Sequence, residues 1–222
     1  MTSLFDRIFG RRRAEAPETE APAIAPPVTT GPEPEEQIRW LRDQIRRDVA
    51  AGFYDEEVIL TNAIDAFADE LDPATLRREA QGMLRAAMAE HAAAQAGWPP
   101  LTDCDRLDDA FAALEATGVI ARQNFTCCGT CGSAEIWDEI DAVGKAGGPT
   151  RGYAFFHMQD TERAAEGDGL YLNYGACEDG EDAALAVAND IVTQLEAHGL
   201  RTEWNGSWSQ RIAVSLDWKR RR

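Results

Sequence analysis

Apolar residues recur every three or four positions through the first half of the chain, as they do on one face of an α-helix. The first such segment ends at Gly52, a residue that readily takes the left-handed conformation that often follows a helix. The second begins at acidic residues 55–57, which suit the positive end of a helix dipole. The third follows Asp72 and Pro73, a capping residue and a proline at the first helical position. The pattern predicts a helical module over residues 37–97.

Helical and strand-like patterns alternate over residues 98–222. Thr102 and Asp105 have the spacing of a capping box at the start of a helix. VIARQNF (119–125) alternates like a strand, and Ser133 is a candidate cap for the helix after it. Two aromatic-rich strands joined by a polar turn come next, at 152–158 and 169–175, followed by an amphipathic helix and a hairpin.

The order of these elements predicts the fold class. From residue 119 it reads β-α-β-β-α-β with one further strand, which is the split βαβ order of ferredoxin-like sheets. The sequence therefore predicts an α+β protein in which a helical module precedes a mixed sheet with helices on one face.

The first 36 residues have a different composition. Apolar residues of the segment 1–13 fall on one side of a short helix ahead of three arginines, which suggests weak contact with a membrane surface or a frayed end. Residues 14–36 hold six of the ten prolines and six glutamates but no basic residue. This composition predicts a disordered acidic tether.

Charge and composition narrow the possible partners and location. The formal net charge of −17 makes binding of nucleic acid to the folded part unfavourable, which leaves a protein or a small molecule as the expected partner. No apolar run reaches the ~18–20 residues that a membrane helix needs, and the first residues lack the pattern of a secretory signal. We therefore expect a soluble cytoplasmic protein whose five cysteines are mostly reduced.

Three of those cysteines lie close together in NFTCCGTCG (124–132), between a predicted strand and a predicted helix. In a metal interpretation, Cys128 and Cys131 chelate zinc from one tight turn. Zinc in a structural site takes four ligands, and the chain contains no second C-x-x-C pair. The remaining ligands would come from other candidate residues: Cys127, His157, Cys104 and Cys177.

Two other interpretations of the same residues stay open. CGTC before a helix locally resembles the thioredoxin active site, where the helix dipole lowers the pKa of one thiol. His157 with Asp160 beside it could act as a general base, which would complete a formal triad with Cys128 as nucleophile. In the third interpretation, the cysteines only pack as small apolar residues and His157 is buried with a backbone partner.

A wider resemblance covers more than half of the chain. TDCDRLDDAF, ARQNFTCCGTCG and FFHMQDTERA, with GLYLNYGA and RIAVSLDW, resemble an uncharacterised bacterial family defined only as a domain of unknown function. The resemblance runs from about Gly97 onward and leaves the tether outside. The resemblance implies a bacterial, cytoplasmic protein, but it does not imply any particular biochemical activity. It also groups five residues in one family pattern: Cys104, Cys127, Cys128, Cys131 and His157.

Three functions remain as hypotheses. The first is a binding or regulatory domain with a zinc site built from cysteine and histidine. The second is a thiol-dependent enzyme that uses Cys128 with His157, in redox or nucleophilic chemistry. The third is an acidic protein-interaction module without a metal.

Overall fold

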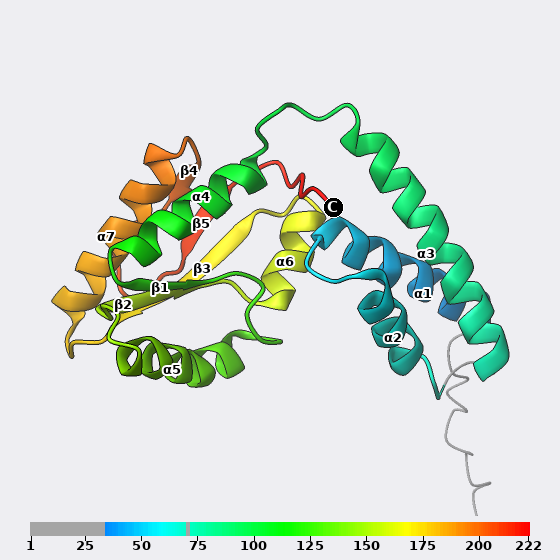
Figure 1. The fold of residues 1–222 in the computed structure, drawn as a ribbon, viewed down its shortest axis with the longest axis horizontal. Coiled ribbons are helices and arrows are strands. Elements are labelled where there is room, and N and C mark those ends of the chain that lie inside the picture. Colours follow the sequence, from blue (N-terminus) through cyan, green and yellow to red (C-terminus); the bar gives the residue numbers. More distant parts are fainter. Residues whose placement is uncertain (1–33, 70–71) are drawn as a thin grey trace, which may run out of the picture. The chain divides into compact units, whose positions relative to one another are not determined.

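Three helices open the part of the chain that the computed structural model describes, residues 34–69 and 72–222. They are α1 (Pro34–Ala51), α2 (Glu56–Ala66) and α3 (Pro73–Gln95) (Figure 1). The carboxylates of Asp55 and Asp72 cap α2 and α3 by accepting backbone N–H groups, at 2.9 Å in each case. The apolar sides of the three helices form a buried cluster of their own, which includes Leu41, Ile45, Ile59, Leu76 and Leu84.

The helical module begins three residues before the predicted boundary at residue 37. Helix α1 begins at Pro34, so residues 34–36 belong to this helix. The segment 1–13 and the rest of the tether lie outside the described residues, and what was expected of them remains a prediction.

A five-stranded mixed sheet follows the helices. Its strands are β1 (Val119–Arg122), β2 (Gly152–Phe155), β3 (Leu170–Ala176), β4 (Arg201–Glu203) and β5 (Ile212–Ser215), in the order β1-β2-β3-β5-β4. Strands β1 and β2 are parallel, and the other neighbouring pairs are antiparallel. The helices of this part are α4 (Asp103–Ala116), α5 (Gly129–Lys145), α6 (Met158–Ala165) and α7 (Glu181–Ala197). The predicted α+β class is confirmed.

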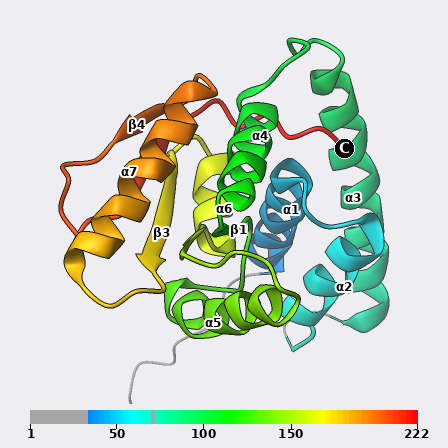
Figure 2. The ribbon, with the colours of Figure 1, turned by 60° about the vertical axis from the view of Figure 1, so that its left-hand side comes forward.

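Helices cover both faces of the sheet, and the prediction that they lie on one face is wrong. Helices α4 and α7 pack on one face, whereas α5 packs on the other (Figures 1 and 2). The reason lies in β1 and β2, whose side chains are apolar on both sides. Val119 and Ala154 join the cluster under α4 and α7, whereas Ile120 and Phe155 join the cluster under α5.

The ferredoxin-like order is also wrong. Met158, predicted as the end of a strand, and residues 159–165, predicted as part of a polar turn, form α6, because His157 and Asp160 make a reciprocal capping box at its start. In addition, β1 and β2 are direct neighbours, joined by the α5 crossover. In a ferredoxin-like sheet, another strand separates the two strands of such a unit.

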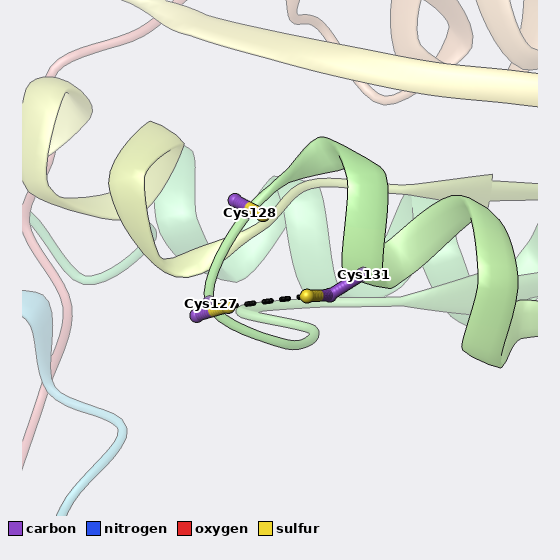
Figure 3. A group of neighbouring side chains, drawn as sticks. All are labelled: Cys127, Cys128 and Cys131. Carbon is purple, nitrogen blue, oxygen red and sulfur yellow. Dashed lines mark hydrogen bonds between the residues drawn. The ribbon is translucent and has the colours of Figure 1, made fainter.

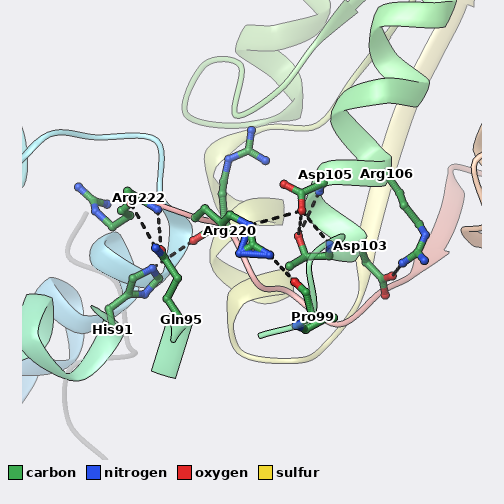
Figure 4. Close-up of polar contacts among 10 residues, drawn as sticks. His91, Gln95, Pro99, Asp103, Asp105, Arg106, Arg220 and Arg222 are labelled. Atoms are coloured by element: carbon green, nitrogen blue, oxygen red, sulfur yellow. Dashed lines mark hydrogen bonds and ion pairs between the residues drawn. The ribbon is translucent and has the colours of Figure 1, made fainter. Parts of the chain in front are cut away.

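A strap of residues 216–222 returns from β5 to the three N-terminal helices (Figure 4). The indole N–H of Trp218 donates to the carbonyl of Ala50 at 3.0 Å. The Arg222 guanidinium donates to the carbonyls of Val49, at 3.2 Å, and Tyr54. Arg220 lies 4.2 Å from the ring centroid of Phe53, and its carbonyl lies 3.1 Å from His91 Nε2. The four basic residues 219–222 are therefore all engaged with partners in the same chain.

Within the described ranges, every helix is too short or too polar to cross a lipid bilayer.

Candidate metal centre

The cysteine cluster lies at the edge of the sheet where the parallel strands β1 and β2 end side by side. Each strand leads into the N-terminus of a helix, α5 after the loop 123–128 and α6 after His157. The loop is fastened to the exit of β2, because Phe125 N–H donates to the Phe156 carbonyl at 2.8 Å. Met158 N–H donates in turn to the Thr126 carbonyl at 3.1 Å. The ends of two helices are therefore held next to each other.

Two residues of this loop have left-handed backbone conformations, Asn124 with φ 50° and Thr126 with φ 58°. Asparagine tolerates this region, but a β-branched residue there is strained, at a cost of order 1–3 kcal/mol. Contacts on both sides hold the turn. The Asn124 amide donates to the Tyr54 hydroxyl at 3.1 Å, and the Thr126 hydroxyl donates to the Cys128 carbonyl at 3.2 Å. The reversal brings Cys127 back toward the start of α5.

Three sulfur atoms meet at this point. Cys127 and Cys128 lie on the end of the loop and Cys131 on the first turn of α5 (Figure 3). Their Sγ atoms all lie within 4.8 Å of one another, and those of Cys127 and Cys131 are 3.5 Å apart. A tetrahedral metal with bonds of ~2.3 Å to sulfur holds its sulfurs about 3.8 Å apart. The three thiols therefore fit one metal ion after small rotamer adjustments.

The position of Cys131 depends on where α5 begins. Ser133 was the candidate cap, and that prediction is wrong, since the helix begins at Gly129 with Cys128 as its N-cap. A cap and the third helical residue face the same side of a helix start, so Cys128 and Cys131 face each other. Gly132 allows α5 to approach the sheet closely, because a Cβ there would lie 2.7 Å from Cζ of the buried Phe155.

The thiols of Cys128 and Cys131 differ in acidity. The backbone N–H of Cys131, followed by the neighbouring thiols, lowers the pKa of Cys128. Hydrogen bonds with the thiols of Cys127 and Cys128, followed by repulsion from their negative charge when ionised, raise the pKa of Cys131 to about 11. Once one thiol of the cluster has ionised, ionisation of the next is less favourable. A bound cation removes this conflict, since it stabilises all three as thiolates.

His157 lies near the cluster but has other partners. Its Nδ1 accepts the N–H of Asp160 at 3.3 Å, and its Nε2 lies 3.0 Å from the Asp160 carboxylate. Burial lowers the pKa of His157, so its neutral form is favoured. The ring is beside α5, because a Cβ at Gly129 would lie 3.5 Å from Nε2. Nδ1 thus caps α6, Nε2 lies beside a carboxylate, and His157 lies outside the group of three sulfurs.

The capping box at α6 has a further partner that the sequence did not reveal. The guanidinium of Arg211, next to β5, binds the buried Asp160 carboxylate and the carbonyl of Tyr171. Arg211 is 51 residues from Asp160 in the chain, so no local pattern connects them. Asp160 is thus a structural centre that joins α6 to the sheet.

The other two cysteines lie away from the cluster. Cys104 is buried in the first turn of α4, beside the backbone of Lys219, and desolvation raises its pKa to about 11. Cys177 follows β3 at the opposite edge of the sheet, where desolvation also raises its pKa. All five cysteines are unpaired. Among the described residues, the group with metal-ligand spacing consists of Cys127, Cys128 and Cys131.

A family model described as a domain of unknown function (DUF6891) matches residues 34–222. The chain belongs to this family. Comparison with curated proteins and with solved structures found no match. The predicted membership of an uncharacterised family is confirmed, and the DUF6891 match also includes the three N-terminal helices, which the resemblance seen in the sequence left out.

The cluster of this DUF6891 domain offers one kind of chemistry most directly. Three soft sulfur donors converge, the pKa of Cys128 is lowered, and two helix N-termini lie next to them. Thiolates are the ligands preferred by zinc and Cu(I). The donors present therefore fit a thiophilic metal ion.

Proposed function

We propose that this DUF6891 protein is a bacterial, cytoplasmic binding or regulatory domain that holds zinc at Cys127, Cys128 and Cys131. The observation that carries the proposal is the convergence of the three Sγ atoms within 4.8 Å. Packing alone does not account for this convergence. Cys127 is exposed and the other two cysteines are half-buried, whereas a cysteine used only as a small apolar residue is typically buried, as Cys104 is.

The hydrogen bonds of His157 favour a metal site over a cysteine nucleophile activated by histidine. A general base needs a free ring nitrogen within reach of the thiol. Nδ1 of His157 accepts the Asp160 N–H in the capping box, Nε2 lies 3.0 Å from the Asp160 carboxylate, and no hydrogen bond joins the ring to a thiol among the described residues. Metal binding to the three sulfurs leaves the box intact.

Elemental analysis after purification under reducing conditions tests the proposal. We expect about one zinc per chain, and loss of most of that zinc in Cys128→Ser and Cys131→Ser. Cys104→Ala and Cys177→Ser are matched controls that remove a thiol outside the cluster and should retain the metal. Less than ~0.2 zinc per wild-type chain, with free reduced thiols, would contradict the proposal.

A second candidate function is dithiol exchange, and one observation favours it. The Cys127 and Cys131 sulfurs are 3.5 Å apart, and the pKa of Cys128 is lowered at a helix N-terminus. In the metal-free protein, this function predicts that Cys128 is alkylated faster at neutral pH than a cysteine in an unstructured peptide. Equal rates would exclude an activated thiol.

A further inference from the structure

We infer that the zinc ion keeps one exchangeable coordination position, and that this position binds a small exogenous thiol as thiolate. The inference rests on the proposed zinc site and adds to it. A closed structural site would use four protein ligands, whereas an open position marks a centre that binds a ligand. The inference stands on the supply of donors, the access to the cluster and the chemistry of the three sulfurs.

No other cysteine or histidine joins the three sulfurs to fill the fourth position. All five cysteines and all three histidines lie in the described residues. His91 bonds the strap carbonyl of Arg220, and His198 bonds the carbonyl of Gln194 on its own helix. His157 is held by Asp160, and no carboxylate of residues 34–69 and 72–222 joins the sulfur group.

The cluster is also accessible from solvent. All three ligands come from one short stretch at the junction of a loop and a helix, so the protein encloses a bound ion from one side. Cys127 is exposed, and Cys128 and Cys131 are partly so. The open position therefore faces outward, where a small molecule can reach it without displacing a protein side chain.

The chemistry of the shell selects the incoming ligand. Three thiolates make the ion a soft acceptor, which favours a fourth sulfur over a carboxylate. In the exchange, the thiol releases its proton to solvent, its sulfur bonds to the metal, and the water molecule that held the position leaves intact. The positive end of the 17-residue helix α5 offsets part of the added negative charge.

X-ray absorption spectroscopy of the full-length zinc protein tests the inference. We expect three sulfurs at ~2.3 Å and one oxygen or nitrogen at ~2.0–2.1 Å in the absence of added thiol. Excess glutathione or free cysteine should change the shell to four sulfurs. Serine and S-methylcysteine are controls that lack a thiol and should leave the spectrum unchanged.

Three results would overturn the inference while leaving the zinc site in place. One is a shell that added thiol does not alter. Another is a protein nitrogen in the fourth position, which His157→Gln would remove from the spectrum. The third is a fourth sulfur in the absence of added thiol, accompanied by a dimer on size-exclusion chromatography. Failure of the zinc proposal itself would be recognised first, as zinc absent from the purified protein.

Discussion

Replacing Gly132 by alanine tests how closely α5 packs on the sheet, because the clash and the gain in helix propensity change the stability in opposite directions. A Cβ at this position would lie 2.7 Å from Cζ of Phe155 and closer still to Cε2. Phe155 cannot easily give way, because its ring is fully buried between Phe125 and Tyr153, with centroids at 5.8 and 6.0 Å. Either the ring or the N-terminal turn of α5 must move. Overpacking of this kind costs about 1–3 kcal/mol, and the gain in helix propensity from glycine to alanine returns at most about 1 kcal/mol.

Gly144→Ala is the matched control on the same helix. Its Cβ would meet only the Thr150 hydroxyl, at 4.0 Å, so the propensity gain should appear undiminished, as a few tenths to about 1 kcal/mol of added stability. Urea unfolding in the presence of a chelator, followed by circular dichroism, measures both variants without metal linkage. We expect Gly132→Ala to be about 2 kcal/mol less stable than Gly144→Ala. If the two variants were equally stable, close packing of α5 on Phe155 would be refuted.

Two further predictions concern the buried thiol of Cys104 and the strap of residues 216–222. The pKa of Cys104 is raised from 9.0 to about 11 in the folded state, so its contribution to stability is present below pH 9 and is lost as the pH rises toward 11. Two pKa units correspond to about 2–3 kcal/mol. In urea titrations at pH 8 to 11, Cys104→Ala should remove this part of the fall in unfolding free energy with pH. An unchanged pH dependence would contradict the burial of the thiol. Arg222→Met removes charged donors from the carbonyls of Val49 and Tyr54. We expect the free energy of unfolding to fall by about 1–3 kcal/mol and hydrogen exchange around residues 49–54 to become faster. Arg201→Met, which removes an exposed arginine paired only with Glu203, should cost less than about 0.5 kcal/mol, and equal losses in both variants would show that the strap does not hold these helices.

Helix starts were predictable because their signals are local. Asp72 with Pro73, and Thr102 with Asp105, are caps readable within four residues, and each caps a helix in the structure. The α6 capping box has the same spacing, but histidine is an uncommon cap and its residues follow an aromatic strand. In the sequence the segment therefore resembles a polar turn, and a turn there gives the β-α-β-β-α-β order of a ferredoxin-like sheet.

Sheet topology depends on contacts that sequence periodicity does not contain. The apolar residues of β1 and β2 showed that these strands are buried, but not that both of their faces are covered. The order β1-β2-β3-β5-β4 arises from pairings such as Arg122 with Phe155 and Leu172 with Ile212, which join residues 33 and 40 positions apart. The strap of residues 216–222 could not be predicted for the same reason. Nothing in the sequence indicates that its basic side chains bond backbone carbonyls rather than extend into solvent.

In the candidate site, too, local features could be predicted from the sequence and tertiary contacts could not. Three cysteines within five positions could be predicted to meet, because one turn and the start of one helix suffice to bring them together. His157 was an equally good candidate in the sequence, since it too ends a strand and precedes acidic residues. What separates ligand from scaffold is whether the polar atoms of a residue already have partners. Nδ1 of His157 caps α6, Nε2 lies beside the Asp160 carboxylate, and Arg211, the residue before β5, binds that carboxylate. Among the described residues, the three sulfurs are partnered by one another and by backbone N–H groups of the first turn of α5, and a metal ion would satisfy the bonding capacity that remains.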